Sequence, residues 1–192
     1  NTVDVTDSYY QNCIRYLVYG NILKNHTYPL SVSAERVFQA MAIAEKALDM
    51  NADYIAHGST GAGNDQIRFD MIFHIMAPEV PVLTPIRDQK LSREQEIAYL
   101  EKHGVKMDWK KSVYSINQGL WGTSVGGKET LTSDQTLPED AYPGRITENN
   151  EKQIELYFEK GQFTGFNKKE FVNPVDAVNE LHKLASGFGI GR

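Results

Sequence analysis

The sequence predicts an α/β protein in which helices cover both faces of a parallel sheet. Helical and strand-like segments alternate over about the first 110 residues, which is the pattern of β–α–β units. Two apolar runs, 54–56 and 80–86, are too short for helices and are predicted to be buried strands. A glycine-rich segment, 58–63, joins the first of these strands to the helix that follows it.

Helices are predicted where apolar side chains recur every three or four residues, because this spacing places them on one helix face. The clearest case is residues 33–50, where Val37, Met41, Ala44 and Leu48 recur at this spacing and form one apolar face. Ser92 opens another helix, and Gln95, three residues later, has the spacing of a capping box. The helices predicted in this half cover residues 7–19, 33–50, 64–76 and 92–103.

The second half of the chain has a different composition. Gly104 is a helix stop, and glycine, threonine and tyrosine become more frequent after Trp109. We therefore expect a domain boundary near residue 112, which divides the chain into residues 1–112 and 113–192. The elements predicted beyond it are a hairpin of residues 153–158 and 162–166, turning at Lys160–Gly161, and a helix from Asn173–Pro174 to about Ser186.

Composition excludes several classes of protein. The chain has 192 residues, of which 41% are hydrophobic and 23% charged, which is typical of a globular protein. A net charge of −5 gives no electrostatic argument for binding nucleic acid or a membrane surface. No apolar run approaches the roughly 20 residues that span a bilayer. Cys13 is the one cysteine, so no internal disulfide can form, which fits a reducing compartment such as the cytoplasm.

The segment from His57 to Arg68 carries the predicted chemistry. Glycines between residues 58 and 63 let a backbone approach a ligand closely, and amides at a helix start favour phosphate or carboxylate. Asn64 and Arg68 lie four residues apart on one helix face. Arg68 can bind a carboxylate through two hydrogen bonds, and Asp65 can accept a hydrogen bond from an ammonium group. Together these two side chains suit an α-amino acid.

Spacing alone leaves a simpler interpretation open, in which the glycines form a turn and Asn64 or Asp65 merely caps the helix. The segment is not a Walker motif, because Asn64–Asp65 stand where lysine and serine or threonine are required. It also lacks the G-x-G-x-x-G pattern of dinucleotide-binding proteins. His57 follows a strand and is expected to be structural rather than catalytic. Tyr28 and Ser33, taken alone, would be a loop tyrosine and a helix cap.

Three segments resemble the argininosuccinate synthase family. Residues 57–69, HGSTGAGNDQIRF, resemble the family hallmark HGATGKGNDQVRF. Residues 114–124, YSINQGLWGTS, resemble the segment YS-x-(D/N)-x-x-L. Residues 28–33, YPLSVS, match a position that the family uses for citrulline. The resemblance runs in order from about residue 7 to residue 192.

This resemblance implies a fold similar to the adenine nucleotide α-hydrolases. Residues 1–112 would be a nucleotide-binding domain with a partial doubly wound parallel sheet, and residues 113–192 part of an α+β synthetase domain. The implied reaction joins citrulline and aspartate to give argininosuccinate, with ATP converted to AMP and pyrophosphate and with Mg²⁺ bound to the phosphates. A cytoplasmic location and a homotetramer of the full-length protein are implied as well.

The resemblance also assigns roles to individual residues, and none of them is catalytic or binds a metal. The implied ATP contacts are Ala56, His57, Gly58, Gly61, Gly63 and Asn64. The implied aspartate contacts are Thr60, Asn64 and Asp65. The implied citrulline contacts are Tyr28, Ser33, Asn64, Arg68, Ser115 and Ser124.

The sequence departs from the family in two ways. Ala62 stands where many members have lysine, so a side-chain contact to phosphate is lost there. The SGGLDTS loop that binds pyrophosphate in the family does not occur, nor do its later citrulline residues and C-terminal helix. We therefore expect the 192 residues alone to be inactive.

Other interpretations of the sequence remain open. A different ATP-pyrophosphatase of the same fold, such as an asparagine synthetase or a tRNA-modifying enzyme, would need the same N-terminal loop. A non-catalytic module that binds an amino acid or nucleotide, or assists assembly, would bind ligands without turnover. A flavodoxin-like domain would carry a coloured flavin.

Overall fold

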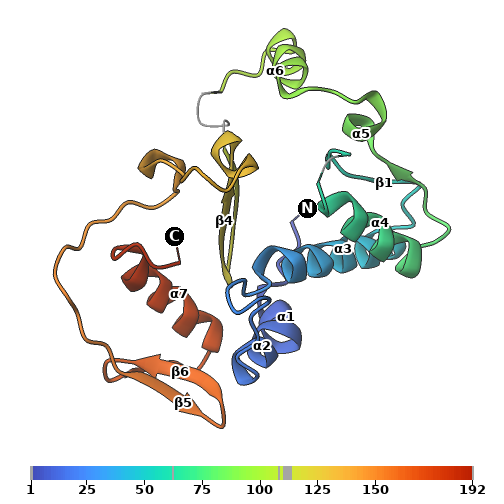
Figure 1. Ribbon diagram of the computed structural model, residues 1–192. Coiled ribbons are helices and arrows are strands. Elements are labelled where there is room, and N and C mark those ends of the chain that lie inside the picture. The colour runs from blue at the N-terminus through green and yellow to red at the C-terminus, as the bar shows by residue number, and fades with distance from the viewer. Residues whose placement is uncertain (1, 62, 108, 110–113, 192) are drawn as a thin grey trace. The chain divides into compact units, whose positions relative to one another are not determined.

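The computed structural model describes residues 2–61, 63–107, 109 and 114–191 (Figure 1). The chain forms two compact units. Unit 1 consists of Asn1–Val3 and Ser33–Val113, and unit 2 of Asp4–Val32 and Tyr114–Arg192. The predicted domain of residues 1–112 differs from unit 1, because residues 4–32 belong to unit 2.

Unit 1 alternates helices and strands. Strands β1 and β2 pair in parallel, with Ile55 opposite Val82 and Ala56 opposite Leu83, which confirms the predicted parallel pairing. The doubly wound arrangement of a larger sheet stays a prediction. The elements in order are α3 (Ser31–Asp49), β1 (Ile55–Ala56), α4 (Asp65–Met76), β2 (Val82–Leu83), α5 (Pro85–Gln89) and α6 (Arg93–Lys102).

The second strand is shorter than predicted. The sequence predicted a strand over 80–86, whereas β2 ends at Leu83 and α5 begins at Pro85. Proline favours the first position of a helix, because its φ is fixed near the helical value and it has no N–H to leave unpaired. The proline therefore ends the strand and starts a helix.

The core of unit 1 lies between α3, α4 and β1. Phe73 of α4 is completely buried, and it packs in one cluster with Ile55 of β1 and three alanines of α3. Alanine side chains let helix backbones approach neighbouring elements closely. The alanines are Ala40, Ala44 and Ala47.

The start and end of α6 confirm two local predictions. The Ser92 hydroxyl accepts a hydrogen bond from the backbone N–H of Gln95 at 3.3 Å. The Gln95 side-chain oxygen accepts one from the backbone N–H of Ser92 at 2.8 Å, which completes the capping box. Gly104 follows the helix with a φ of +83°, the left-handed conformation typical of a helix stop.

Replacing Ser92 by alanine is expected to lower the stability of the protein by about 1 kcal/mol, because one helical N–H loses its acceptor. Replacing it by aspartate, which can also cap a helix, should retain most of that stability. Urea unfolding of both variants measures the difference. Equal losses in the two variants would contradict a capping role for the hydroxyl.

Unit 2 combines a helical segment, two hairpins and a C-terminal helix. The helical segment runs from Thr6 to Tyr19 and contains a π-helical turn at Tyr10–Ile14. The hairpin of Ser115–Gly119 and Gly122–Gly126 was not predicted. The elements are α1 (Thr6–Tyr9), η1 (Tyr10–Ile14), α2 (Arg15–Tyr19), β3 (Ser115–Gly119), β4 (Gly122–Gly126), η3 (Lys128–Leu131), η4 (Glu139–Ala141), β5 (Leu156–Glu159), β6 (Gln162–Phe166), β7 (Lys169–Glu170) and α7 (Pro174–Ser186).

The predicted hairpin and the predicted last helix are confirmed, except that the first strand begins at Leu156 instead of residue 153. Strands β5 and β6 are antiparallel, and Lys160 and Gly161 between them have φ values of 50° and 86°. Positive φ at both central residues is the geometry that favours tight hairpins. Helix α7 begins after Asn173, whose side-chain oxygen accepts a hydrogen bond from the N–H of Val175 at 2.9 Å.

The N-terminal helical segment belongs to unit 2 because of its apolar side chains and its contacts. Tyr10 and Ile14 are completely buried. The Asn173 amide at the start of α7 donates a hydrogen bond to the Asp7 carboxylate at 3.2 Å. These contacts join residues far apart in the sequence, so the spacing of residues could not predict them. Within the described part of the chain, no helix is long and apolar enough to cross a membrane.

Candidate functional site

The glycine-rich segment, residues 57–64, connects β1 to α4 in unit 1 and is called the glycine loop here. Ala56 ends β1, and the N–H of His57 still donates to the carbonyl of Leu83 on β2 at 3.1 Å. Asn64 precedes the first residue of α4, but its side chain accepts no capping hydrogen bond. The alternative in which Asn64 serves as a helix cap is therefore not what the structure shows.

Glycine is not required by the fold at three positions of the loop. None of Gly58, Gly61 and Gly63 has a φ in the left-handed range. A Cβ atom at Gly58 would meet only Ile86 at 4.0 Å, and one at Gly61 only Arg87 at 3.7 Å, both ordinary contacts. A Cβ atom at Gly63 would meet nothing within 4 Å. These positions therefore leave space beside the backbone that the described protein atoms do not fill.

Asp65 and Arg68, the two predicted amino-acid contacts, form an ion pair with each other. The Arg68 guanidinium lies 2.7 Å from one oxygen of the Asp65 carboxylate. The other oxygen lies 3.1 Å from Nε of Arg36 on α3, a residue that sequence reasoning missed. The three side chains are 33%, 25% and 18% exposed, respectively, so the group lies at a partly open surface of unit 1.

This arrangement can bind charged groups of a ligand. A carboxylate between two cations, as Asp65 is, can exchange one of them for an ammonium group. A guanidinium has five N–H donors, so Arg68 can bind a ligand carboxylate while it contacts Asp65. Asp65 also lies in the first turn of α4, where the helix dipole favours a negative charge.

A second polar group ties the glycine loop to α4 and α5, and we call its four residues, His57, Gln66, Asp70 and Arg87, the Asp70 network. The Asp70 carboxylate contacts Nε2 of His57 at 3.1 Å and forms an ion pair with Arg87 of α5. Arg87 also donates to the side-chain oxygen of Gln66 at 3.2 Å. The Gln66 amide in turn donates to the carbonyl of Gly61 at 2.6 Å.

The His57 ring points into unit 1, as a structural role requires. Its side chain is 7% exposed, and its centroid lies 5.4 Å from that of Phe69 and 6.2 Å from that of Phe73. The backbone N–H of Ser59 donates to Nδ1 at 3.3 Å. Since Nδ1 is an acceptor, Nε2 carries the ring proton and donates it to Asp70.

Asp70 is held in its ionised form by this network. Burial alone would raise the pKa of Asp70, but hydrogen bonds from Arg87 and His57, together with the positive charge of Arg87, bring it below its usual value. A carboxyl group whose pKa is lower in the folded state stabilises the protein above its unfolded pKa of about 3.9. That contribution is lost as the pH falls through the folded pKa.

We therefore expect Asp70→Asn to reduce stability at neutral pH, and the difference from the unsubstituted protein to narrow as the pH falls below about 4. Urea unfolding of the variant and of the unsubstituted protein, from neutral to acid pH, measures how the stability of each changes with pH. Asp88→Asn, on the neighbouring helix α5, is a suitable control, because the amide oxygen can still accept the hydrogen bond from Thr84. A difference that stays constant down to acid pH would contradict this role of Asp70.

In unit 2, two predicted citrulline contacts share one face of the β3–β4 hairpin. Ser115 pairs with Gly126, and Asn117 pairs with Ser124. Because side chains alternate along a strand and paired residues point to the same side, Ser115, Asn117 and Ser124 share a face. Asn117 was not predicted as a site residue, although its spacing from Ser115 could have indicated it. Thr123, on the opposite face, donates to the carbonyl of Gly191 at 2.9 Å.

The loop that contains Tyr28 contacts the same hairpin. The indole N–H of Trp121, at the turn between β3 and β4, donates to the carbonyl of Pro29 at 2.9 Å. The Tyr28 backbone pairs with Lys24 across a tight turn. Ser33 lies inside the first turn of α3 rather than at its cap, since the helix begins at Ser31.

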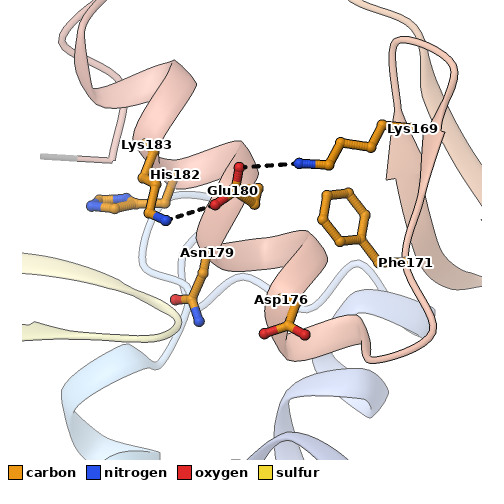
Figure 2. A pocket seen from close by; sticks show the side chains of 7 residues that line it. All are labelled: Lys169, Phe171, Asp176, Asn179, Glu180, His182 and Lys183. Carbon is orange, nitrogen blue, oxygen red and sulfur yellow. Dashed lines mark hydrogen bonds and ion pairs between the residues drawn. The ribbon is translucent and has the colours of Figure 1, made fainter.

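An open pocket on unit 2 contains none of the predicted site residues. Figure 2 shows Glu180 of α7 between Lys169 and Lys183, at distances of 3.4 Å and 2.6 Å. Its single carboxylate therefore neutralises part of the charge of the two lysines. The pocket is lined by Lys169, Phe171, Asp176, Asn179, Glu180, His182 and Lys183.

The chain is similar to known proteins over its whole length. Residues 1–106 match the family model described as the arginosuccinate synthase N-terminal HUP domain. The argininosuccinate synthase of Sulfurisphaera tokodaii is 34% identical over 192 residues, which are 100% of this chain and 49% of the relative. That of Methanocaldococcus jannaschii is 31% identical over 194 residues, with 100% and 49% covered. That of Prochlorococcus marinus is 38% identical over 178 residues, with 90% and 44% covered. The chain thus spans about half the length of the curated relatives it matches.

Proposed function

Because the chain belongs to the argininosuccinate synthase family, we propose that the protein joins citrulline to aspartate with the conversion of ATP to AMP and pyrophosphate. One observation carries the proposal. Asp65 and Arg68 contact each other at the partly open surface where the glycine loop enters α4. An acceptor for an ammonium group and a donor for a carboxylate thus lie beside a turn suited to phosphate.

ATP would bind at the glycine loop. The loop amides can donate to phosphate oxygens, and the glycines leave room for close approach. His57 would contact ATP through its backbone, since its two ring nitrogens already bond to the Asp70 carboxylate and to the N–H of Ser59. The residues proposed to line the ATP site are Ala56, His57, Gly58, Gly61, Gly63 and Asn64.

The amino-acid substrates would bind beside this loop. Asp65 would accept hydrogen bonds from the ammonium group of aspartate, and Arg68 would bind the carboxylate of citrulline. Hydroxyl and amide groups would complete both sites. Thr60 and Asn64 are proposed for aspartate, and Tyr28, Ser33, Asn64, Ser115 and Ser124 for citrulline.

The proposed reaction has two displacements. The ureido oxygen of citrulline attacks the α-phosphorus of ATP and releases pyrophosphate. The amine of aspartate, once deprotonated, then attacks the ureido carbon of the resulting adenylate and releases AMP. The residues proposed here would act by holding the reactants in line and by stabilising charge.

A magnesium ion would enter with the nucleotide. In the described ranges, no three or more His, Cys, Asp or Glu side chains are grouped so that they could hold a metal ion. Magnesium keeps several water ligands and commonly binds substrate phosphates with few protein ligands. The ion would screen phosphate charge. A homotetramer and a cytoplasmic location also remain predictions.

Two measurements test the proposed function. Calorimetry on the 192 residues is expected to show binding of ATP, citrulline and aspartate. Mass spectrometry is expected to detect argininosuccinate only when a segment with the SGGLDTS loop, which these residues lack, is also present. Omitting aspartate should abolish argininosuccinate but leave citrulline binding intact. Failure of the folded protein to bind any of the three would sink the proposal.

A further inference from the structure

We propose that Arg87 is a positioning residue that fixes the conformation of the glycine loop for nucleotide binding, acting through Asp70 and Gln66. This inference rests on the proposed function, because it requires that the loop binds ATP. Arg87 lies on α5, outside the hallmark segment, and no substrate contact is proposed for it.

Two chains of side-chain contacts connect the Arg87 guanidinium to the glycine loop, one near each end of the loop. At the start of the loop, Asp70 connects Arg87 to His57, and His57 accepts the N–H of Ser59 at 3.3 Å. Towards the end of the loop, Gln66 connects Arg87 to the carbonyl of Gly61, through bonds of 3.2 Å and 2.6 Å. One side chain therefore sets the position of two separate peptide groups.

The loop has little other support. No backbone–backbone hydrogen bond joins residues 58–61 to another described residue. Apart from that of Ser59, which donates to His57, their amides therefore stay available to a ligand, and the orientation of the loop depends on the side-chain bonds of His57 and Gln66. A loop whose amides must all point at one phosphate group loses affinity when those amides can rotate.

The guanidinium group is suited to this role. It is planar and carries several donors in a fixed geometry, so it can bind the Asp70 carboxylate and the Gln66 oxygen at once. A lysine ammonium is a compact charge, and it would keep the attraction to Asp70 without that fixed geometry. The Arg87 and Asp70 side chains are 30% and 38% exposed, so removing the pair should leave unit 1 folded.

The test compares four variants, Arg87→Gln, Arg87→Lys, Gln66→Ala and Asp88→Asn. Calorimetry is expected to show ATP affinity about tenfold lower in Arg87→Gln and an intermediate loss in Arg87→Lys. Gln66→Ala should weaken ATP binding while leaving the Arg87–Asp70 pair in place. Asp88→Asn should change ATP affinity less than twofold, because Asp88 approaches Arg87 only at 3.9 Å with a side chain that is 63% exposed, where an ion pair contributes little.

Hydrogen exchange of the loop amides distinguishes positioning from a general loss of stability. Exchange at Ser59–Gly61 should accelerate in Arg87→Gln while exchange in the α3 core stays unchanged. If Arg87→Gln fails to fold, Arg87→Lys and Gln66→Ala decide the question. Normal ATP affinity in these variants would overturn the inference, whereas absence of ATP binding in the unsubstituted protein would instead overturn the proposed function.

Discussion

Replacing Arg68 by glutamine is expected to weaken citrulline binding by roughly 30- to 1000-fold, because a charged, two-bond contact with the substrate carboxylate is lost. Such contacts contribute about 2–4 kcal/mol when they are shielded from water, and each 1.4 kcal/mol is tenfold in affinity. Arg68→Lys should recover little, since an ammonium group cannot form both bonds in one plane. Calorimetric titration with citrulline measures both variants.

Arg36→Gln provides the matched control for Arg68. Both arginines contact the Asp65 carboxylate, at 3.1 Å and 2.7 Å, but only Arg68 is proposed to touch citrulline. We expect citrulline affinity in Arg36→Gln to fall much less than in Arg68→Gln. Equal losses in the two variants would mean that Arg68 serves only to hold Asp65, and normal citrulline binding by Arg68→Gln would remove it from the site.

Replacing Gly58 by alanine is expected to weaken ATP binding by roughly 5- to 150-fold without destabilising the protein. The methyl group would meet only Ile86, at 4.0 Å, so the folded chain can accept it. Alanine in place of glycine at a compatible position stabilises by about 0.4–1 kcal/mol, because the unfolded chain is less flexible. A nucleotide in contact with the backbone would clash with the methyl group, at a cost of about 1–3 kcal/mol.

Gly104→Ala should give the opposite result. Gly104 has a φ of +83° and nothing within 4 Å of a Cβ position. Alanine there costs roughly 1–2 kcal/mol of backbone strain, but it should not affect nucleotide binding. Thermal unfolding and calorimetry on both variants separate the two effects. Loss of stability in Gly58→Ala with unchanged ATP affinity would contradict the proposed contact.

Features that depend on neighbouring residues were predictable from the sequence. The capping box of Ser92 and Gln95, the turn at Lys160–Gly161 and the cap at Asn173 each involve residues at most three apart. Their geometry follows from local chemistry, so the sequence predicts it directly.

Features that depend on tertiary packing were predicted less well. The apolar spacing from Val37 to Leu48 correctly placed Ala44, which is completely buried, on the inner face of α3. It wrongly placed Leu48 there, which is 49% exposed, and it missed Ala40, which is also completely buried. Close packing favours small side chains on the inner face of α3, and hydrophobic periodicity alone does not reveal how closely a helix packs. The strand predicted over residues 80–86 was also too long, because Pro85 begins a helix there, whereas the strand predicted over residues 162–166 matches β6.

Long-range contacts explain the residues that were missed at the candidate site. Arg36 precedes Asp65 by 29 residues, and Arg87 follows Asp70 by 17. Neither arginine has a spacing that marks it out from other surface arginines. The ligand assignments came from the family resemblance, whereas spacing alone predicted only an anion-binding turn with an acid and a base beside it.

Because Asp65 lies between two arginines, a substrate ammonium group would have to compete with these arginines for the Asp65 carboxylate. Under the proposed roles, an arriving ammonium group replaces a cation that is already present, so its net electrostatic gain is the difference between two similar contacts. Discrimination among amino acids would then depend on shape and on neighbouring hydroxyl and amide groups. Opening the Asp65–Arg68 pair would expose partners for both amino acids at once, so whichever substrate binds first would ease the entry of the second.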